Sequence, residues 1–264
     1  MANRALLIGI NSYPDCPLSG CVNDITDMAK FLTTKAGFRA EDIRLLTDAR
    51  ATTREIRTRL DWLVFDLKAG DRILFHFSGH GVQVATRDRK GELDGLDEAV
   101  CPHDFDWSDI NMIRDKEFYH IFGSIPEGVS AYWISDSCHS GDLQREMLPP
   151  NRKEKRIIPP VDIQWRIDAA KEKGLTTPPK TLPGIVLISG CKSNQTSADA
   201  SFNGRANGAL SYFLLQELNK PEGLTTPMST VIATVAIELE LKNYTQEPQL
   251  EGPDELKEKT FLWS

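Results

Sequence analysis

The chain has 264 residues and a formal net charge of −7, with 31 Lys and Arg against 38 Asp and Glu. This length can bury one large core, and the acidic balance gives no support for a nucleic-acid partner. Because no apolar run is long enough to cross a bilayer and Met1 leads straight into an apolar strand rather than a signal peptide, we expect a cytoplasmic protein with no membrane partner. The five cysteines include no C-x-x-C pair, which predicts free thiols.

The first half of the chain alternates predicted strands and helices. Short, mostly apolar runs predict buried strands at 5–10, 43–46, 72–77 and 129–135. Apolar residues that recur on one face predict helices at about 24–35, 56–67 and 115–122, the second of them behind a capping box at 52–55. The acidic segment 82–115 is interpreted as a loop. This order predicts a parallel sheet with helices on both faces.

The second half of the chain begins with a change in amino-acid composition. Residues 145–181 are polar, basic and bounded by prolines, and a stretch this long between two strands is usually functional or disordered. A buried strand is then predicted at 184–190, with helices near 208–218 and 229–241. The tail segments 247–250 and 260–263 are expected to supply the last strand.

Two residues at strand ends predict nucleophilic chemistry. Cys138 follows the strand at 129–135 and His80 follows the strand at 72–77, each in a turn of Gly and Ser residues. In a parallel sheet both lie at one edge, where an imidazole can accept the thiol proton and the backbone N–H groups of Gly81 and Cys138 can bind an oxyanion. The alternative is that both residues are structural. His139 is a rival base, but its side chain, adjacent in sequence to the thiol, should point away from it.

These segments resemble a known family. The sequences SGHG at 78–81 and DSCHSG at 136–141 are similar to the catalytic pair of the metacaspases and orthocaspases, caspase-like cysteine peptidases of bacteria, plants, fungi and protists. Further matching segments follow in the same order at 20–24, 94–98, 189–199, 207–210 and 246–250. The resemblance implies a caspase-like three-layer α/β/α sandwich around a six-stranded, mostly parallel sheet.

The resemblance also implies the domain organisation. One peptidase domain is expected over 1–264, without a prodomain. Its large-subunit-like part is 1–144, its small-subunit-like part is 182–264, and the cleavable linker 145–181 separates them.

The family pattern further implies an acidic pocket for the residue before the cleaved bond. The matching positions are Cys21, Asp24, Ser78 and Asp136, and a carboxylate pair suits Arg or Lys. For Asp24 alone, a helix N-cap is the alternative, whereas Asp136 beside a thiol would be costly to bury without a cation. We expect an endopeptidase that cuts polypeptides after Arg or Lys through a thioester acyl-enzyme. The alternative is a catalytically silent caspase-like binding or regulatory module.

Many metacaspases bind calcium at an acidic cluster apart from the catalytic pair. Asp97 and Asp115 fit that pattern, but Lys116 and Arg145 stand where further carboxylates are expected. Two cations should abolish most of the affinity for a hard cation, so we expect no metal or cofactor and a dispensable calcium ion. The alternative reading is that the acidic segment is simply a solvated surface.

The linker is rich in the residues that the pocket should select. It therefore offers sites for self-cleavage or for an upstream activating protease, and a solvated basic linker is the alternative reading. The processing candidates are Arg145, Arg152, Lys153, Lys155 and Arg156.

Overall fold

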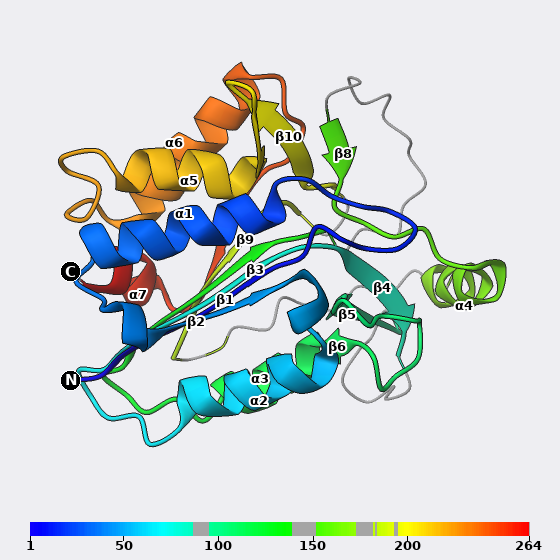
Figure 1. The fold of residues 1–264 in the computed structure, drawn as a ribbon, viewed down its shortest axis with the longest axis horizontal. Helices are drawn as coiled ribbons and strands as arrows, with labels where there is room; N and C mark the ends of the chain where they lie inside the picture. Colours follow the sequence, from blue (N-terminus) through cyan, green and yellow to red (C-terminus); the bar gives the residue numbers. More distant parts are fainter. Residues whose placement is uncertain (87–94, 139–151, 173–181, 183, 193–194, 264) are drawn as a thin grey trace.

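The computed structural model describes residues 1–86, 95–138, 152–172, 182, 184–192 and 195–263. Its centre is a six-stranded sheet in the order β12-β9-β7-β3-β1-β2 (Figure 1). Every neighbouring pair from β2 to β9 is parallel, and β12 runs antiparallel to β9. The strands are β1 (Asn3–Gly9), β2 (Ile43–Thr47), β3 (Arg72–Ser78), β7 (Ser130–Asp136), β9 (Val186–Ser189) and β12 (Gln249–Glu251).

Helices cover both faces of this sheet, which confirms the predicted three-layer arrangement (Figure 1). One layer contains α1 (Cys21–Thr34), α5 (Ala209–Leu218) and α6 (Met228–Leu241). The other contains α2 (Thr53–Val64) and α3 (Asp115–Phe122). Side chains alternate across β1, so Leu6 and Ile8 enter one core while Ala5 and Leu7 enter the other. A strand buried on both faces needs apolar residues at nearly every position.

The prediction of an uninterrupted loop at 82–115 is wrong, because three strands occur in the described part of that segment. It contains an antiparallel sheet of β4 (Gly81–Ala85), β5 (Leu96–Val100) and β6 (Ile113–Arg114). The acidic residue Asp97 of β5 is buried because Lys116 and Arg114 pair with its carboxylate. The acidic composition suggested a solvated loop, but β5 is a strand whose buried Asp97 is neutralised by neighbouring cations.

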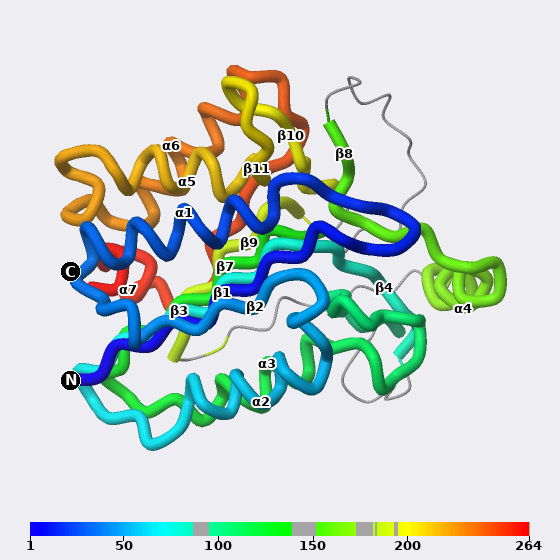
Figure 2. The backbone as a smooth tube through the Cα atoms, viewed as in Figure 1, coloured from blue at the N-terminus to red at the C-terminus, as the bar shows by residue number. Residues whose placement is uncertain are grey.

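The basic segment 145–181 also contains regular structure. It includes β8 (Arg152–Glu154) and α4 (Val161–Lys171), and α4 packs Ile167 and Ala170 against Leu96. A third sheet has the order β11-β10-β8, with β10 at Ala198–Phe202 and β11 at Arg205–Gly208. Figure 2 shows the chain after β8 running beside the loop between β1 and α1 before it reaches α4.

The element ends differ from the prediction in two informative places. Helix α1 begins at Cys21 with Gly20 as its N-cap, so Asp24 lies inside the first turn and is not the cap. The tail contributes only β12 to the sheet, because Phe261–Trp263 forms a short 3₁₀ turn, η3. The remaining short elements are η1 (Ala40–Asp42), η2 (Asp48–Arg50) and α7 (Asp254–Lys257). Among the described residues, none of the helices has the length and apolar character needed to cross a bilayer.

Candidate active site

The predicted thiol and imidazole lie at one edge of the central sheet. Ser78 of β3 pairs in register with Asp136 of β7, so the two strands end side by side. His80 follows β3 and Cys138 follows β7. Both side chains are buried, with 1% of His80 and 0% of Cys138 exposed. The parallel topology therefore brings the two residues to the same edge.

The ring of His80 is held in one orientation. Its Nε2 lies 2.7 Å from the carbonyl oxygen of Cys16, so Nε2 carries the proton that this bond requires. Its Nδ1 is buried and has no hydrogen-bond partner among the described residues. The Tyr13 ring packs 4.5 Å away, centroid to centroid, and the Tyr13 hydroxyl accepts the His80 backbone N–H. Burial lowers the pKa of His80 to about 4, although backbone groups of Cys16 and Lys155 favour the charged form.

The thiol of Cys138 faces the connection between β9 and β10. Its Sγ lies 3.9 Å from Cys191 Sγ and 3.8 Å from the carbonyl oxygens of Gln195 and Ser197. The backbone N–H of Ser197 also donates to this sulfur. Within the described part of the chain, the thiol makes no hydrogen bond to His80. The predicted pair therefore shares an edge of the sheet, and no hydrogen bond joins the two side chains among the described residues.

Three of the four predicted pocket residues contact a single ammonium group. Lys155, from the basic segment, is fully buried, and its Nζ lies 3.0 Å from Asp136 Oδ1 and 3.4 Å from Asp24 Oδ2. The hydroxyl oxygen of Ser78 accepts from the same Nζ at 2.9 Å. The fourth residue, Cys21, is buried at the start of α1, and burial raises the pKa of its thiol.

Asp136 is held by groups that the sequence did not single out. Its Oδ1 accepts from the Ser197 hydroxyl at 2.7 Å, and its Oδ2 accepts from both the hydroxyl and the backbone N–H of Ser211. Burial alone would raise the pKa of Asp136, but the Lys155 ammonium and these hydrogen bonds outweigh it and lower the pKa. The N–H of Ser211 belongs to the first turn of α5, where helix N–H groups favour an anion.

Of the two pocket carboxylates, Asp24 is protonated more easily than Asp136. Its carboxylate accepts from Asn207 Nδ2 at 2.9 Å and from the Gly208 backbone N–H. Burial raises its pKa to about 7; Lys155 opposes that shift, and the nearby charge of Asp136 adds to it. A side chain at 208 would collide with Asp136 Oδ2 and Lys155 Nζ. Glycine at 208 therefore lets the start of α5 approach the pocket.

The backbone of Lys155 is bound as well as its side chain. Its carbonyl oxygen accepts from the N–H of Gly81 at 3.1 Å and of Cys138 at 3.3 Å, and its N–H donates to the Ser197 carbonyl. The preceding strand β8 pairs antiparallel with β10, with Glu154 opposite Ala198. The segment lies across the strand ends as an extended peptide whose Lys155 carbonyl meets the two predicted oxyanion donors.

The other processing candidates have different surroundings. Arg145 lies outside the described residues. Lys153 Nζ donates to the Pro17 carbonyl at 2.8 Å, and Arg156 pairs with Glu154. Arg152 reaches the end of α6. Lys155 is therefore the linker cation that the acidic pocket holds in the part of the chain that the structure describes.

One acidic residue of the calcium pattern, Asp97, is paired with two cations. Lys116 Nζ lies 2.8 Å from Asp97 Oδ1, and Arg114 Nε lies 3.5 Å from Asp97 Oδ2. These cations occupy the oxygen atoms that a metal would need. No cluster of three or more His, Cys, Asp or Glu side chains suited to a metal occurs in the described ranges, and Arg145 lies outside them.

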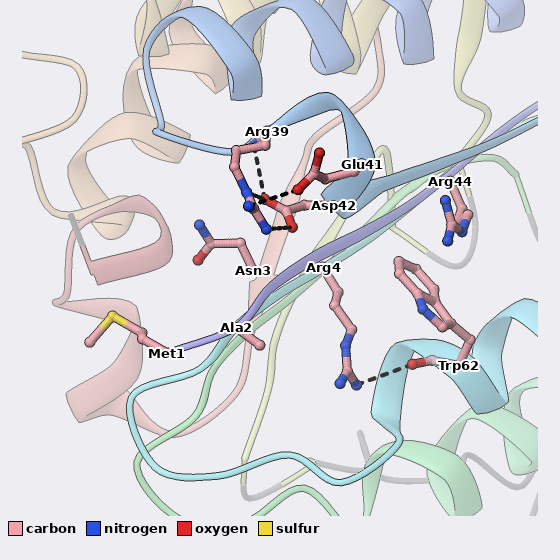
Figure 3. Close-up of a pocket in the computed structure, with 9 residues that line it drawn as sticks. All are labelled: Met1, Ala2, Asn3, Arg4, Arg39, Glu41, Asp42, Arg44 and Trp62. Carbon is pink, nitrogen blue, oxygen red and sulfur yellow. Dashed lines mark hydrogen bonds and ion pairs between the residues drawn. The ribbon is translucent and has the colours of Figure 1, made fainter.

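A separate hollow lies at the opposite edge of the sheet, where β1 and β2 begin (Figure 3). Arg39 is paired there with Glu41 and Asp42, and the guanidinium of Arg44 lies 5.0 Å from the Trp62 ring centroid. Arg39 is thus paired within the hollow and Arg44 lies over an aromatic ring, and the hollow lies away from Cys138 and the acidic pocket.

Comparison with known proteins identifies relatives along the chain. A family model described as the metacaspase, peptidase C14 domain matches residues 3–145, more than half of the chain. Metacaspase-1 of Kluyveromyces lactis is 31% identical over 96% of this chain, and Metacaspase-9 of Arabidopsis thaliana is 28% identical over 98% of it. The chain spans 66% of the Kluyveromyces protein and 96% of the Arabidopsis protein.

Solved structures show the same architecture. A protein of Geobacter sulfurreducens superimposes with a TM-score of 0.72 and 25% identity, covering 100% of this chain and 99% of the other. Caspase-1 of Spodoptera frugiperda superimposes with a TM-score of 0.60 and 12% identity, over 95% of this chain and 86% of the other. At that identity the insect protein shows the fold alone, and the fold is caspase-like.

Proposed function

The chain belongs to the metacaspase family, and on this premise we propose that it is a cysteine endopeptidase that cuts polypeptides after Lys or Arg. One observation carries the proposal. The Lys155 ammonium lies between Asp24 and Asp136 while the Lys155 carbonyl accepts from Gly81 and Cys138. This is the arrangement that a substrate needs when the bond after a basic residue is attacked.

In the proposed reaction, the sulfur of Cys138 attacks the carbonyl carbon of the residue in the pocket. The thiol proton moves to His80 Nδ1, the ring nitrogen left unprotonated by the bond from Nε2 to Cys16. The N–H groups of Gly81 and Cys138 stabilise the oxyanion, and one such donor is worth roughly 10²- to 10³-fold in kcat. His80 then returns the proton to the leaving amine, and water hydrolyses the thioester.

The thiol must turn before it can attack. In this structure its contacts are with Cys191, Gln195 and Ser197, and it makes no hydrogen bond to His80 within the described residues. A rotation about the Cα–Cβ bond of Cys138 moves the sulfur without moving the backbone N–H that binds the oxyanion. On this proposal, the Lys155 segment is a peptide that is bound but not yet attacked.

The charges of the pocket explain the proposed preference for basic residues. Two buried carboxylates can balance an ammonium or a guanidinium, whereas an aspartate placed there would add a third negative charge. Peptides that differ only in Arg, Lys or Asp before a coumarin amide test this preference. Release from the Asp peptide at the rate of the Lys peptide would contradict it.

We further propose that the enzyme activates itself by cutting between Lys155 and Arg156. The fully buried Lys155 fills the pocket, so a second peptide must displace it. Intact-mass measurement of the wild-type chain should show fragments that meet at 155–156, and the Cys138→Ala chain should stay whole. Lys155→Met should lose this cut, and Lys153→Met, on the same strand, should keep it. Fragments from Cys138→Ala would indicate an upstream protease instead.

The alternative function is a silent binding module that holds its own Lys155 permanently. An arginyl chloromethyl ketone distinguishes the two functions, because it alkylates a thiol only where the pocket and the nucleophile work together. Labelling of Cys138 that Asp136→Asn abolishes supports an enzyme. A chain that neither reacts nor cuts any Lys or Arg peptide supports the silent module.

A further inference from the structure

We infer that the enzyme recognises a second basic residue, an arginine three positions before the lysine at which it cuts. The inference rests on the proposed function. The site that holds this arginine consists of the Tyr244 ring and the carbonyl groups at the end of α6, and in this structure Arg152 occupies it.

The contacts of Arg152 match the shape of a guanidinium. Its Nη1 donates to the Asn243 carbonyl at 2.7 Å and its Nη2 donates to the Lys242 carbonyl at 2.9 Å. Its Cζ lies 3.8 Å from the centroid of the Tyr244 ring. A planar fork can stack on a ring and donate to two acceptors at once, which a lysine ammonium cannot do with the same geometry.

The end of α6 supplies negative potential at this point. Helix α6 ends at Leu241 with Lys242 as its C-cap, and the last carbonyl groups of a helix carry its partial negative charge. Asn243 has a φ of 57°, in the left-handed region that commonly ends helices. The two carbonyl acceptors are thus part of the helix terminus itself.

The aromatic platform is built independently of the linker. Tyr244 packs 6.1 Å from Phe202 of β10 and 6.2 Å from Phe213 of α5, centroid to centroid. Phe202 in turn stacks on Tyr212 at 3.9 Å. These rings come from the body of the protein and remain available to a peptide that replaces β8.

The spacing of the two basic residues is set by the strand. β8 pairs with β10 so that Arg152 is opposite Ala200 and Glu154 is opposite Ala198. Three extended residues span roughly 10 Å, so one peptide can fill the Tyr244 site and the acidic pocket together. The Nζ of Lys153 donates to the Pro17 carbonyl and the Ser19 hydroxyl, and both of these contacts are exposed.

Peptide substrates test the inference on the full-length wild-type enzyme. The reference is the coumarin amide of Arg-Lys-Glu-Lys, and its first residue is replaced by citrulline, lysine or leucine. Citrulline keeps the planar shape without the charge. We expect kcat/KM to fall about tenfold for citrulline and leucine and by less for lysine. Norleucine in the second position is the control and should change kcat/KM less than citrulline in the first.

A variant enzyme tests whether the preference for arginine at this position arises at Tyr244. Tyr244→Leu should reduce the ratio of kcat/KM between the arginine and citrulline peptides, mainly through KM, and the part that remains is due to the carbonyl groups of Lys242 and Asn243. Tyr212→Leu, in the same aromatic cluster without a contact to Arg152, should preserve the ratio. Equal cleavage of all four peptides by the wild-type enzyme would overturn the inference and leave the proposed function intact. Failure to cut any of them would refute the proposed function itself.

Discussion

Replacing Lys155 by methionine tests the central contact of the site. Methionine keeps most of the length of the side chain and removes its charge. The variant is made in a Cys138→Ala background so that self-cleavage cannot complicate the unfolding transition. Asp24 and Asp136 then lose the cation that lies 3.4 Å and 3.0 Å from their oxygens, and Ser78 loses a hydrogen bond.

Removing one partner of a buried ion pair costs about 3–5 kcal/mol. At about 2–4 °C per kcal/mol for domains of 150–250 residues, the midpoint of thermal unfolding should fall by about 6–20 °C. Lys153→Met in the same background is the matched control. Lys153 bonds one carbonyl and one hydroxyl at the surface, so its loss should shift the midpoint by little.

The loss should depend on pH. The pKa of Asp24 is already raised from 3.8 to about 7, and removing the ammonium that acts to lower it raises it further. Between the unfolded-state pKa of 3.8 and the raised folded-state pKa, the folded protein holds a proton on Asp24 that the unfolded chain has released. The free energy of unfolding therefore falls as the pH rises through this range. Lys155→Met should therefore be more destabilised at pH 8 than at pH 5. Equal midpoints for Lys155→Met and Lys153→Met at both pH values would refute the buried contact.

Three further outcomes are expected. The self-cleavage rate should change only modestly near pH 7, where Asp24 takes up a proton, and should fall steeply only toward about pH 4, since the lowered pKa of His80 keeps the imidazole neutral above that value; gel densitometry after a pH jump measures it, and complete loss of cleavage already at pH 5.5 would disprove the assignment. We propose that calcium is dispensable, so EDTA should leave peptide cleavage unchanged, while Lys116→Glu beside Asp97 should make cleavage sensitive to EDTA; inhibition of the wild type would contradict this. Asp136→Asn should lower kcat/KM for the Lys peptide about 100-fold, as a lost buried charge pair predicts, and an unchanged kcat/KM would exclude Asp136 from the pocket.

The central strands could be predicted from sequence because their burial leaves a clear pattern. The runs that form β1, β3 and β7 are apolar at almost every position, as strands covered on both faces must be. The edge where His80 and Cys138 meet follows from that parallel order alone. The acidic β5 could not be recognised, because its buried Asp97 is balanced by cations from residues 114 and 116 that only the fold brings to it.

The choice of Lys155 among the linker cations could not be predicted from sequence. It depends on the register of β8 against β10, a pairing between distant segments that leaves no local signal. The Cys16 carbonyl that orients His80 is a backbone group, which any residue type would supply. Ser197, Asn207 and Ser211 are small polar residues of the kind found in many loops. Their role becomes visible only when Asp24 and Asp136 lie beside them.

Because β8 pairs with β10, a cut after Lys155 and the departure of the cut strand from the pocket are two separate events. A gel records only the cut. A cut after Lys155 leaves residues 1–155 in one piece, so the new chain end remains tethered next to the pocket that produced it. If the strand keeps the contacts of the uncut chain, Arg152 would still rest on Tyr244 and the new terminal carboxylate would face the N–H groups of Gly81 and Cys138. The first product is therefore an intramolecular competitor at a high effective concentration. The lag between the appearance of fragments and the onset of turnover measures how fast this strand leaves.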